Sequence, residues 1–170
     1  IREDSLNRLD FESLLNKVPP EHRVFTGIRQ THYLNGQVFF RSLEALFVYD
    51  EETYTINVLA HENSIFNSYL INDRIYVDLD EVGLVNVVDN AFAPIPNTER
   101  YASDRIYGIL PYDDELLIYS RNNGFKIFDG NTFSDFGEEV NVYLADHPGY
   151  RMQWLDNERI AIGTLSGGLL

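Results

Sequence analysis

A short pattern recurs four times along the chain and constrains its fold more than any other feature. Each copy is a polar turn followed by strand-forming residues, and the first apolar positions of the copies are separated by 37, 41 and 44 residues. A period of this length indicates stacked or radially arranged units that bury their apolar faces against one another. The four copies are Asn35–Phe40, Asn72–Val77, Asp113–Ile118 and Asn157–Ile162.

The residues that follow each copy are also regular. Eight residues after the first apolar position comes a glycine in the last three copies, whereas the first copy has Ala45 seven residues on. An apolar stretch follows and ends at an aspartate in the first three copies. Glycine permits the positive φ of a tight hairpin, and aspartate can fix a turn by accepting backbone N–H bonds. The glycines are Gly83, Gly124 and Gly168, and the aspartates, which we interpret as structural, are Asp50, Asp89 and Asp129.

The third copy predicts four short antiparallel strands within about 40 residues, which describes one propeller blade. A continuous β-sandwich is the alternative, since it is also built from short strands and frequent turns. The fixed order of turn, strand, glycine, strand and aspartate favours the propeller. The sequence thus predicts an all-β fold, a partial β-propeller of about three and a half four-stranded antiparallel blades. The strands expected in the third copy cover 106–112, 116–120, 125–128 and 132–136.

Residues 1–22 lie outside the repeat and predict a short N-terminal helix and linker. Apolar residues recur there at three-to-four spacing after a possible cap at Asp4 or Ser5, and Pro19-Pro20 ends the pattern. Residues 23–170 form the predicted propeller fragment, with repeats near 23–57, 58–97, 98–140 and an incomplete one at 141–170. The apolar positions of the expected helix are Leu6, Leu9, Leu14, Leu15 and Val18.

The last copy stops as its third strand begins. Because blades need a ring of neighbours to cover their faces, we expect either a fragment of a larger propeller or a homodimer formed through exposed blade faces.

The composition limits the partners and the chemistry. The chain has 13 Lys and Arg against 27 Asp and Glu, a formal net charge of −14, and no basic cluster that could follow phosphates. We therefore expect no nucleic-acid partner and no contact with an anionic membrane surface through this chain. The absence of cysteine excludes disulfides, thiolate zinc sites and thiol nucleophiles. The sequence shows neither a signal peptide nor an apolar run long enough to span a bilayer.

The repeats resemble the two-component regulator propeller family, whose units carry a strand, a Gly-Thr step, a Gly-Gly turn and a further strand. Residues 159–169 carry the clearest match, including Gly163-Thr164 and Gly167-Gly168, and residues 116–129 follow the same order. The resemblance implies an extracytoplasmic, periplasmic sensor domain of a membrane-bound hybrid histidine kinase of the Bacteroidetes type, responding to glycans. It implies ligand binding without catalysis, and no cofactor or metal.

Propeller sites usually form where the turns between second and third strands converge at one mouth of the channel. In this chain those turns suggest five ligand-binding residues. Arginine could hold a carboxylate or sugar hydroxyls through forked hydrogen bonds, and tyrosine could stack on a sugar ring. Ordinary turn residues are the alternative interpretation. The five candidates are Arg41, Asp78, Tyr119, Arg121 and Asn122.

Three carboxylates within four residues, at Asp78, Asp80 and Glu81, suggest calcium or a glycosidase pair, but the glycine and the bidentate acid of a calcium loop are missing. Solvated turn acids explain them better, and the four histidines are too widely spaced for a metal helix.

Three functions are therefore considered: a sensor that binds a carbohydrate or other small ligand, a protein-interaction or assembly scaffold, and a carbohydrate-active propeller enzyme. The repeat resemblance favours the first, and the enzyme is disfavoured because no convergent nucleophile and base can be named from the spacing.

Overall fold

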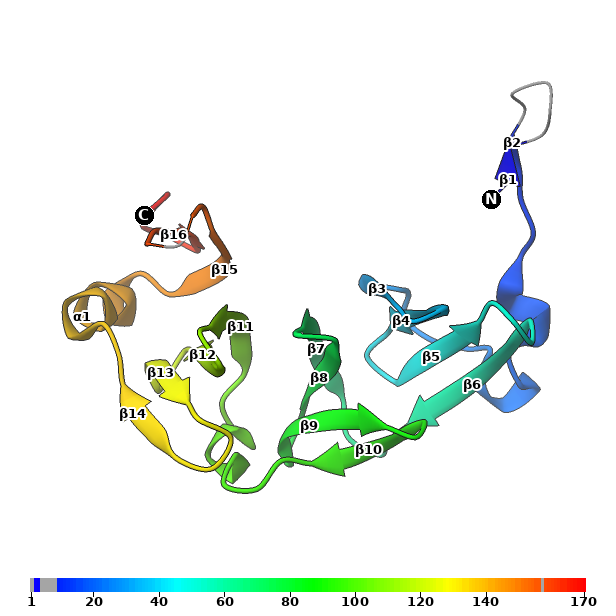
Figure 1. The fold of residues 1–170 in the computed structure, drawn as a ribbon, viewed down its shortest axis with the longest axis horizontal. Helices are drawn as coiled ribbons and strands as arrows, with labels where there is room; N and C mark the ends of the chain where they lie inside the picture. The colour runs from blue at the N-terminus through cyan, green and yellow to red at the C-terminus, as the bar shows by residue number, and fades with distance from the viewer. Residues whose placement is uncertain (1, 4–8, 157) are drawn as a thin grey trace.

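The computed structural model describes residues 2–3, 9–156 and 158–170. Four antiparallel sheets lie side by side in an open arc (Figure 1). The first three have four strands each, paired in chain order, and the fourth pairs two strands. Such up-and-down sheets in radial arrangement are propeller blades rather than the two layers of a sandwich. The predicted propeller architecture is confirmed.

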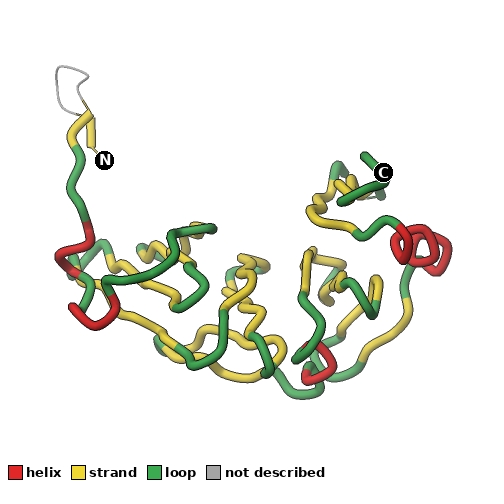
Figure 2. Tube along the Cα trace, turned by 180° about the vertical axis from the view of Figure 1, so that it is seen from behind, coloured by secondary structure: helices red, strands yellow, loops and turns green. Residues whose placement is uncertain are grey.

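Each blade begins with its innermost strand, on the concave side of the arc, and runs outward (Figures 1 and 2). A two-residue pair, β1 (Arg2–Glu3) with β2 (Leu9–Asp10), precedes the blades. The blade strands are β3 (Gln30–Leu34), β4 (Gln37–Arg41), β5 (Ala45–Asp50) and β6 (Thr55–Ala60); β7 (Ile65–Ile71), β8 (Arg74–Leu79), β9 (Gly83–Val88) and β10 (Ala91–Pro94); β11 (Ile106–Tyr112), β12 (Glu115–Ser120), β13 (Gly124–Phe128) and β14 (Phe133–Asp135); β15 (Gly149–Trp154) and β16 (Ile160–Thr164).

The turns have the chemistry that the repeat predicted. The β7–β8 hairpin places Asn72 and Asp73 at φ 48° and 56°, the left-handed conformation of a two-residue turn. Gly83 follows the β8–β9 turn with φ 106°, and a Cβ there would lie 2.5 Å from the carbonyl oxygen of Thr98. Both the conformation and the close approach therefore require glycine at this position.

The structural interpretation of the repeated aspartates is confirmed for two of them. In Asp50 and in Asp129, Oδ1 accepts backbone N–H bonds from the residues two and three positions further on. Asp89 contributes differently, since it adopts φ 49° in the two-residue β9–β10 turn. These aspartates lie in the outer hairpins of the first three blades and fix the turns there.

The core is divided into layers between neighbouring blades. Alternate residues of one strand enter opposite layers: Ile75 and Val77 of β8 pack toward the first blade, while Tyr76 packs toward the third. The first layer joins blades one and two, the second joins blades two and three, and the third joins blades three and four. Completely or almost completely buried members include Leu46, Ile65 and Val77 in the first layer, Ile106 and Ile118 in the second, and Leu117 and Phe125 in the third.

A hydrogen bond from one repeated position reinforces each layer. Arg41, Asp78 and Tyr119 each lie three residues after the first apolar position of their repeat, in the second strand of the blade. Each bonds to the backbone of the residue that opens the innermost strand of the next blade. We call these three bonds the latches. They are Arg41 Nη1 to the Ile65 carbonyl at 3.3 Å, the Ile106 N–H to Asp78 Oδ2 at 3.0 Å, and the Gly149 N–H to the Tyr119 hydroxyl at 2.9 Å.

A β-bulge accompanies every latch. The pairing of the innermost strand shifts directly after Ile65, Ile106 and Gly149, so the same irregularity recurs in three blades. A bulge disturbs the ladder and leaves backbone groups to be satisfied elsewhere. The latch side chains of the preceding blade meet that need.

The prediction of an N-terminal helix is wrong for the described residues. The chain there forms two 3-10 turns, η1 (Leu14–Lys17) and η2 (Pro20–His22), and is extended at Val18 with ψ 133°. Pro19 disfavours helical backbone at the preceding residue, and neither proline can donate an N–H. Val18 is buried against Ala45 and Phe47, so the apolar spacing reflects packing on the first blade. The expected caps and Leu6 lie outside the described residues.

One α-helix lies where none was expected. It is α1 (Glu138–Asp146), between β14 and β15 (Figures 1 and 2). Leu144 is buried and Val140 packs against the same third layer. Asn141 fixes the helix to the blade, because its Oδ1 accepts the Phe125 N–H at 2.7 Å. A third 3-10 turn, η3 (Glu99–Tyr101), precedes β11.

Replacing Tyr119 with Phe removes one latch while keeping the ring. The buried Gly149 N–H then loses its acceptor, so the free energy of unfolding should fall by about 1–3 kcal/mol. Urea unfolding measures the change, and Tyr33→Phe, on a side chain that is 59% exposed, is the control. Equal midpoints for Tyr119→Phe and the wild type would show that the latch adds nothing.

Asp78 should make stability depend on pH. Burial raises the pKa of this carboxyl to about 8, against the opposing effects of the Ile106 hydrogen bond and Arg105. In the unfolded chain the pKa is about 3.9, so between about pH 4 and pH 8 unfolding releases a proton and stability falls as pH rises. The slope should approach, at most, about 1.4 kcal/mol per pH unit.

Asp78→Asn should remove this dependence, because an amide stays neutral and its oxygen can still accept from Ile106. Unfolding midpoints measured from pH 4 to pH 8 should diverge in favour of the variant as pH rises. Asp80→Asn, a neighbouring turn carboxylate, is the control. Parallel profiles of Asp78→Asn and wild type would contradict the assignment.

Candidate functional site

Three of the five residues expected to bind ligand are buried in the latches. Arg41, Asp78 and Tyr119 are 3%, 1% and 1% exposed. Burial and the positive charge of Arg29 lower the pKa of Arg41, and burial raises the pKa of the Tyr119 phenol. Their contacts join blades, and their role toward a ligand stays a prediction.

The other two expected residues lie at the surface. Arg121 and Asn122 are exposed in the β12–β13 turn. The buried carboxylate of Asp104 holds this turn by accepting the Asn122 N–H at 3.1 Å and the Ser120 hydroxyl at 2.6 Å. With Tyr119, the turn lines a small hollow of about 150 Å³ against α1. The structure thus brings Tyr119, Arg121 and Asn122 together, whereas Arg41 and Asp78 belong to other blades.

The acidic turn and the histidines form no metal centre in the part of the chain that the structure describes, where no group of three or more His, Cys, Asp or Glu side chains is arranged around a possible ion. His32 is held by a bond of its Nε2 to the Ser68 hydroxyl at 2.9 Å. Burial lowers its pKa.

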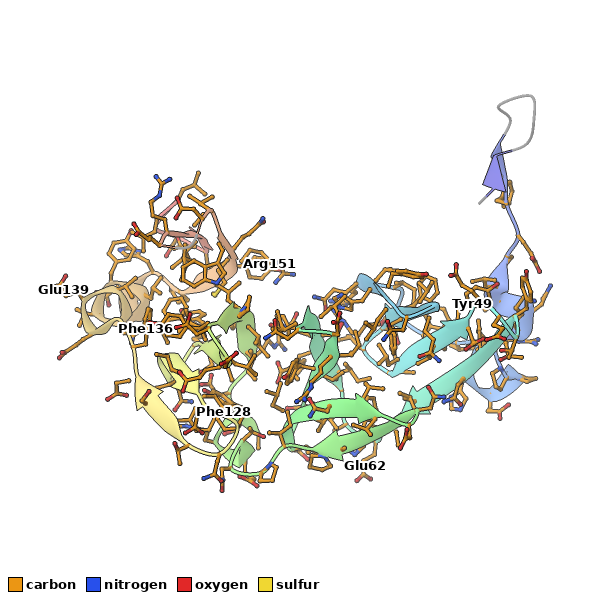
Figure 3. The ribbon with its side chains drawn as sticks, in the orientation of Figure 1. Tyr49, Glu62, Phe128, Phe136, Glu139 and Arg151 are labelled. Atoms are coloured by element: carbon orange, nitrogen blue, oxygen red, sulfur yellow. The ribbon has the colours of Figure 1, made fainter. Side chains whose placement is uncertain are left out.

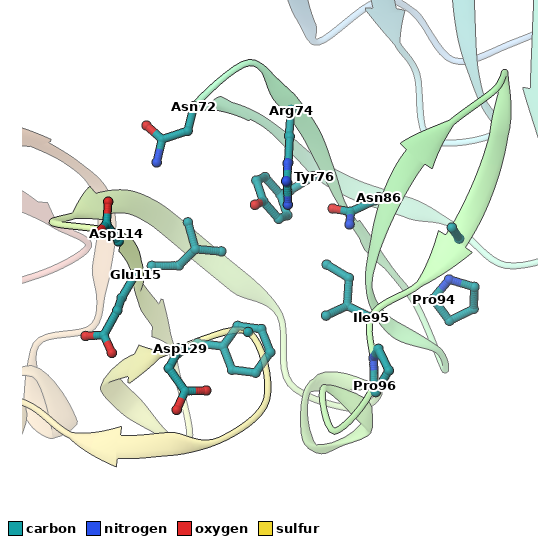
Figure 4. Close-up of a pocket in the computed structure, with 14 residues that line it drawn as sticks. Asn72, Arg74, Tyr76, Asn86, Pro94, Ile95, Pro96, Asp114, Glu115 and Asp129 are labelled. Atoms are coloured by element: carbon teal, nitrogen blue, oxygen red, sulfur yellow. The ribbon is translucent and has the colours of Figure 1, made fainter.

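A cleft of about 460 Å³ opens between the second and third blades (Figure 4). One wall comes from β8, β9, β10 and the segment after β10, and the other from β12, β13 and their hairpins. Tyr76 and Phe128 provide apolar surface at its base, both nearly buried. The polar groups that line it are Asn72, Arg74, Asn86, Asp114, Glu115 and Asp129.

The cleft has unused hydrogen-bonding capacity. Asn86 Oδ1 is buried and has no hydrogen-bond partner in the described structure. Bonds from Thr132 and Asn131 hold the pKa of Asp129 below its usual range, so this carboxylate is ionised at neutral pH. Arg74 faces the same space in Figure 4. One guanidinium among three acidic side chains suits a neutral, hydroxyl-rich ligand better than an anion.

The cleft lies at the opposite end of the blade strands from the turns in which the sequence predicts ligand-binding residues. The cleft uses the hairpins between first and second strands, at Asn72–Arg74 and Asp113–Glu115, which the repeat had identified only as turns. One sequence feature did relate the two walls of the cleft, because Arg74 and Glu115 are the first residues of the second strands in neighbouring repeats. Nothing in the spacing, however, indicated that a cleft would open between these two blades.

No helix of the described chain is long and apolar enough to cross a membrane.

No protein-family model matches the chain, and no curated protein matches it. Solved structures do. YCF48 from Cyanidioschyzon merolae aligns with a TM-score of 0.61 at 13% identity, over 92% of this chain and 55% of that one. The extracellular domain of the one-component system BT4673 from B. thetaiotaomicron aligns with a TM-score of 0.63 at 15% identity, over 89% and 21%. The N-terminal domain of Nup159 aligns with a TM-score of 0.51 at 11% identity, over 81% and 39%.

The chain therefore spans about half or less of the length of these structures. At such identities the likeness shows the fold alone. Together with the sheet topology, it establishes that this chain is made of β-propeller blades.

Proposed function

We propose that this chain is a non-catalytic ligand-binding module, the input part of a two-component signalling protein, and that it recognises a carbohydrate or a similar hydroxyl-rich ligand. The cleft between the second and third blades carries the proposal. Its combination of apolar base, amide, guanidinium and carboxylate groups is typical of sites that orient a small polar ligand.

The unpartnered Asn86 oxygen is the most specific support. A buried acceptor without a partner costs free energy, on the order of 1–3 kcal/mol, which a ligand donor would recover. Sugar hydroxyls supply such donors and can accept from Arg74 at the same time. The carboxylates of Asp114 and Glu115, in the opposite wall, provide further acceptors.

The position of the cleft suggests how binding would become a signal. Its walls belong to two blades, so a ligand that contacts both favours one arrangement of the blades over others. That preference would bias segments attached to the propeller, and a histidine kinase is the output that the repeat resemblance suggests. An extracytoplasmic location belongs to the same proposal, and the likeness to an extracellular one-component domain supports it.

Calorimetric titration with neutral oligosaccharides such as xylotetraose, cellotetraose and maltotetraose tests the proposal. At least one should bind, and Arg74→Ala should weaken that affinity roughly tenfold or more, because a hydrogen bond to a charged group contributes about 1.5–3 kcal/mol. Arg159→Ala is the matched control, since Arg159 occupies the equivalent repeat position outside the cleft and pairs with Asp156.

Two results would overturn the proposal. Binding that is unaffected by Arg74→Ala, or affected equally by Arg159→Ala, would remove the cleft as the site. Release of shorter products from any of these oligosaccharides would instead assign the chain to the enzymes.

A further inference from the structure

The innermost strands of the blades carry no acidic residue, although 27 of the 170 residues are Asp or Glu. These strands read QTHYL, IFNSYLI, IYGILPY and GYRMQW. Three exposed arginines accompany them: Arg29 directly precedes β3, Arg105 directly precedes β11, and Arg151 lies in β15. Within a strongly acidic chain, the concave side of the arc is therefore locally basic.

One position on these strands repeats as an aromatic side chain. Phe66, Tyr107 and Tyr150 are the extra residues of the three bulges that follow the latches. A bulge re-aims its side chain, and here the same register recurs in three consecutive blades. The rings of Tyr107 and Tyr150 lie 6.0 Å apart, between blades three and four. We call these three aromatic residues, with Arg105 and Arg151, the inner rim.

The guanidinium groups of the inner rim are stacked on its rings. Arg105 Cζ lies 3.9 Å from the ring centroid of Phe66, and Arg151 Cζ lies 4.6 Å from that of Tyr150. Among the residues that the structure describes, neither arginine has a carboxylate within ion-pair distance. Figure 3 shows Arg151 on the side of β15 that faces the interior of the arc.

Stacking prepares an arginine for a carboxylate. It restrains the planar group, whose N–H edge matches the two oxygens of a carboxylate. Arg151 Nη1 donates one bond to the Tyr150 carbonyl at 3.1 Å, and the guanidinium has further N–H groups beyond this bond. The phenol hydroxyls of Tyr107 and Tyr150 add donors beside the guanidinium groups. The inner rim thus differs from the acidic cleft, which suits neutral ligands.

We infer that the inner rim is a second binding site, selective for acidic oligosaccharides of the uronate class. Arg105 and Arg151 would each hold one sugar carboxylate through paired N–H···O bonds. The two arginines belong to the third and fourth blades, so a ligand that engages both must cross the junction between these blades. A ligand with two carboxylates on different sugar units, that is an oligomer, can do so. The inference does not depend on the cleft.

An acidic peptide fits this surface less well. A line along the inner rim passes from blade to blade, across the innermost strands instead of along the edge of one. A peptide on that line could not add to a sheet, so its backbone groups would lack the partners that strand addition supplies. A uronate oligomer has no such row of amides, and its hydroxyls and carboxylates can bond to isolated phenol and guanidinium donors.

Titration of the chain with tetragalacturonate at low ionic strength tests the inference, with galactotetraose as the neutral match and a tetraglutamate peptide as the acidic one. Tetragalacturonate should bind at least tenfold more tightly than either. Its affinity should fall severalfold when salt rises from about 20 to about 200 mM, because the Debye length then falls to about 7 Å and exposed charges are screened. Arg151→Gln and Arg105→Gln should each weaken binding about tenfold, in line with a lost charge-assisted bond.

Arg159→Gln is the control, and it should leave tetragalacturonate binding within about twofold. Melting temperatures of all variants verify that they fold. Equal affinity for galactotetraose, tighter binding of tetraglutamate, or binding unchanged in both inner-rim variants would overturn the inference. Neutral-sugar binding and its loss in Arg74→Ala report on the cleft, whereas tetragalacturonate binding and its loss in the two inner-rim variants report on the inner rim. Failure of one site is therefore distinguishable from failure of the other.

Discussion

Burial of apolar surface between neighbouring blades is the interaction on which the rest of this structure depends. Each sheet has apolar side chains on both faces, as the opposite directions of Ile75 and Tyr76 on one strand show. A single four-stranded sheet cannot cover both faces, so each blade is stable only against its neighbours. Apolar packing tolerates sliding, however, because it is non-directional. The latches fix how neighbouring blades are placed, because each is a directional hydrogen bond between a side chain of one blade and the first residue of the innermost strand of the next blade.

The repeat in the sequence was sufficient to predict the blades, because their information is local. Turn residues such as Asn72-Asp73 and Gly83 determine where a hairpin closes, and period-two apolar residues determine which faces are buried. The same reasoning failed at the N-terminus. The leucine spacing there resembles a helical face, but Pro19 and contact with Phe47 decide the conformation. It also missed α1, whose short apolar face, Val140 and Leu144, is recognisable only once the third layer is known.

The candidate site was less predictable than the fold, because side-chain direction near a turn depends on the neighbouring blade. In the sequence, Arg41, Asp78 and Tyr119 are polar residues near turns, and this position predicts side chains that face a ligand. These three residues occupy the same position of the repeat, and each forms a hydrogen bond to the backbone of the next blade. That role becomes apparent only when the next blade is in place. Arg74 and Asn86 gave the opposite problem, since each is unremarkable in sequence and gains significance from the cleft that two blades enclose.

The three latches between blades are made by groups with different proton affinities, so the three blade junctions respond differently to pH. The first latch is the guanidinium of Arg41, a group that is always charged in water. The third latch is the phenol of Tyr119, whose raised pKa keeps it protonated. Only the carboxyl of the middle latch changes charge near neutrality. The cleft opens along that same middle junction. The charge at the middle junction therefore varies with pH near neutrality, whereas the charges at the two flanking junctions do not, so pH acts on the arc at the junction that also bears the cleft.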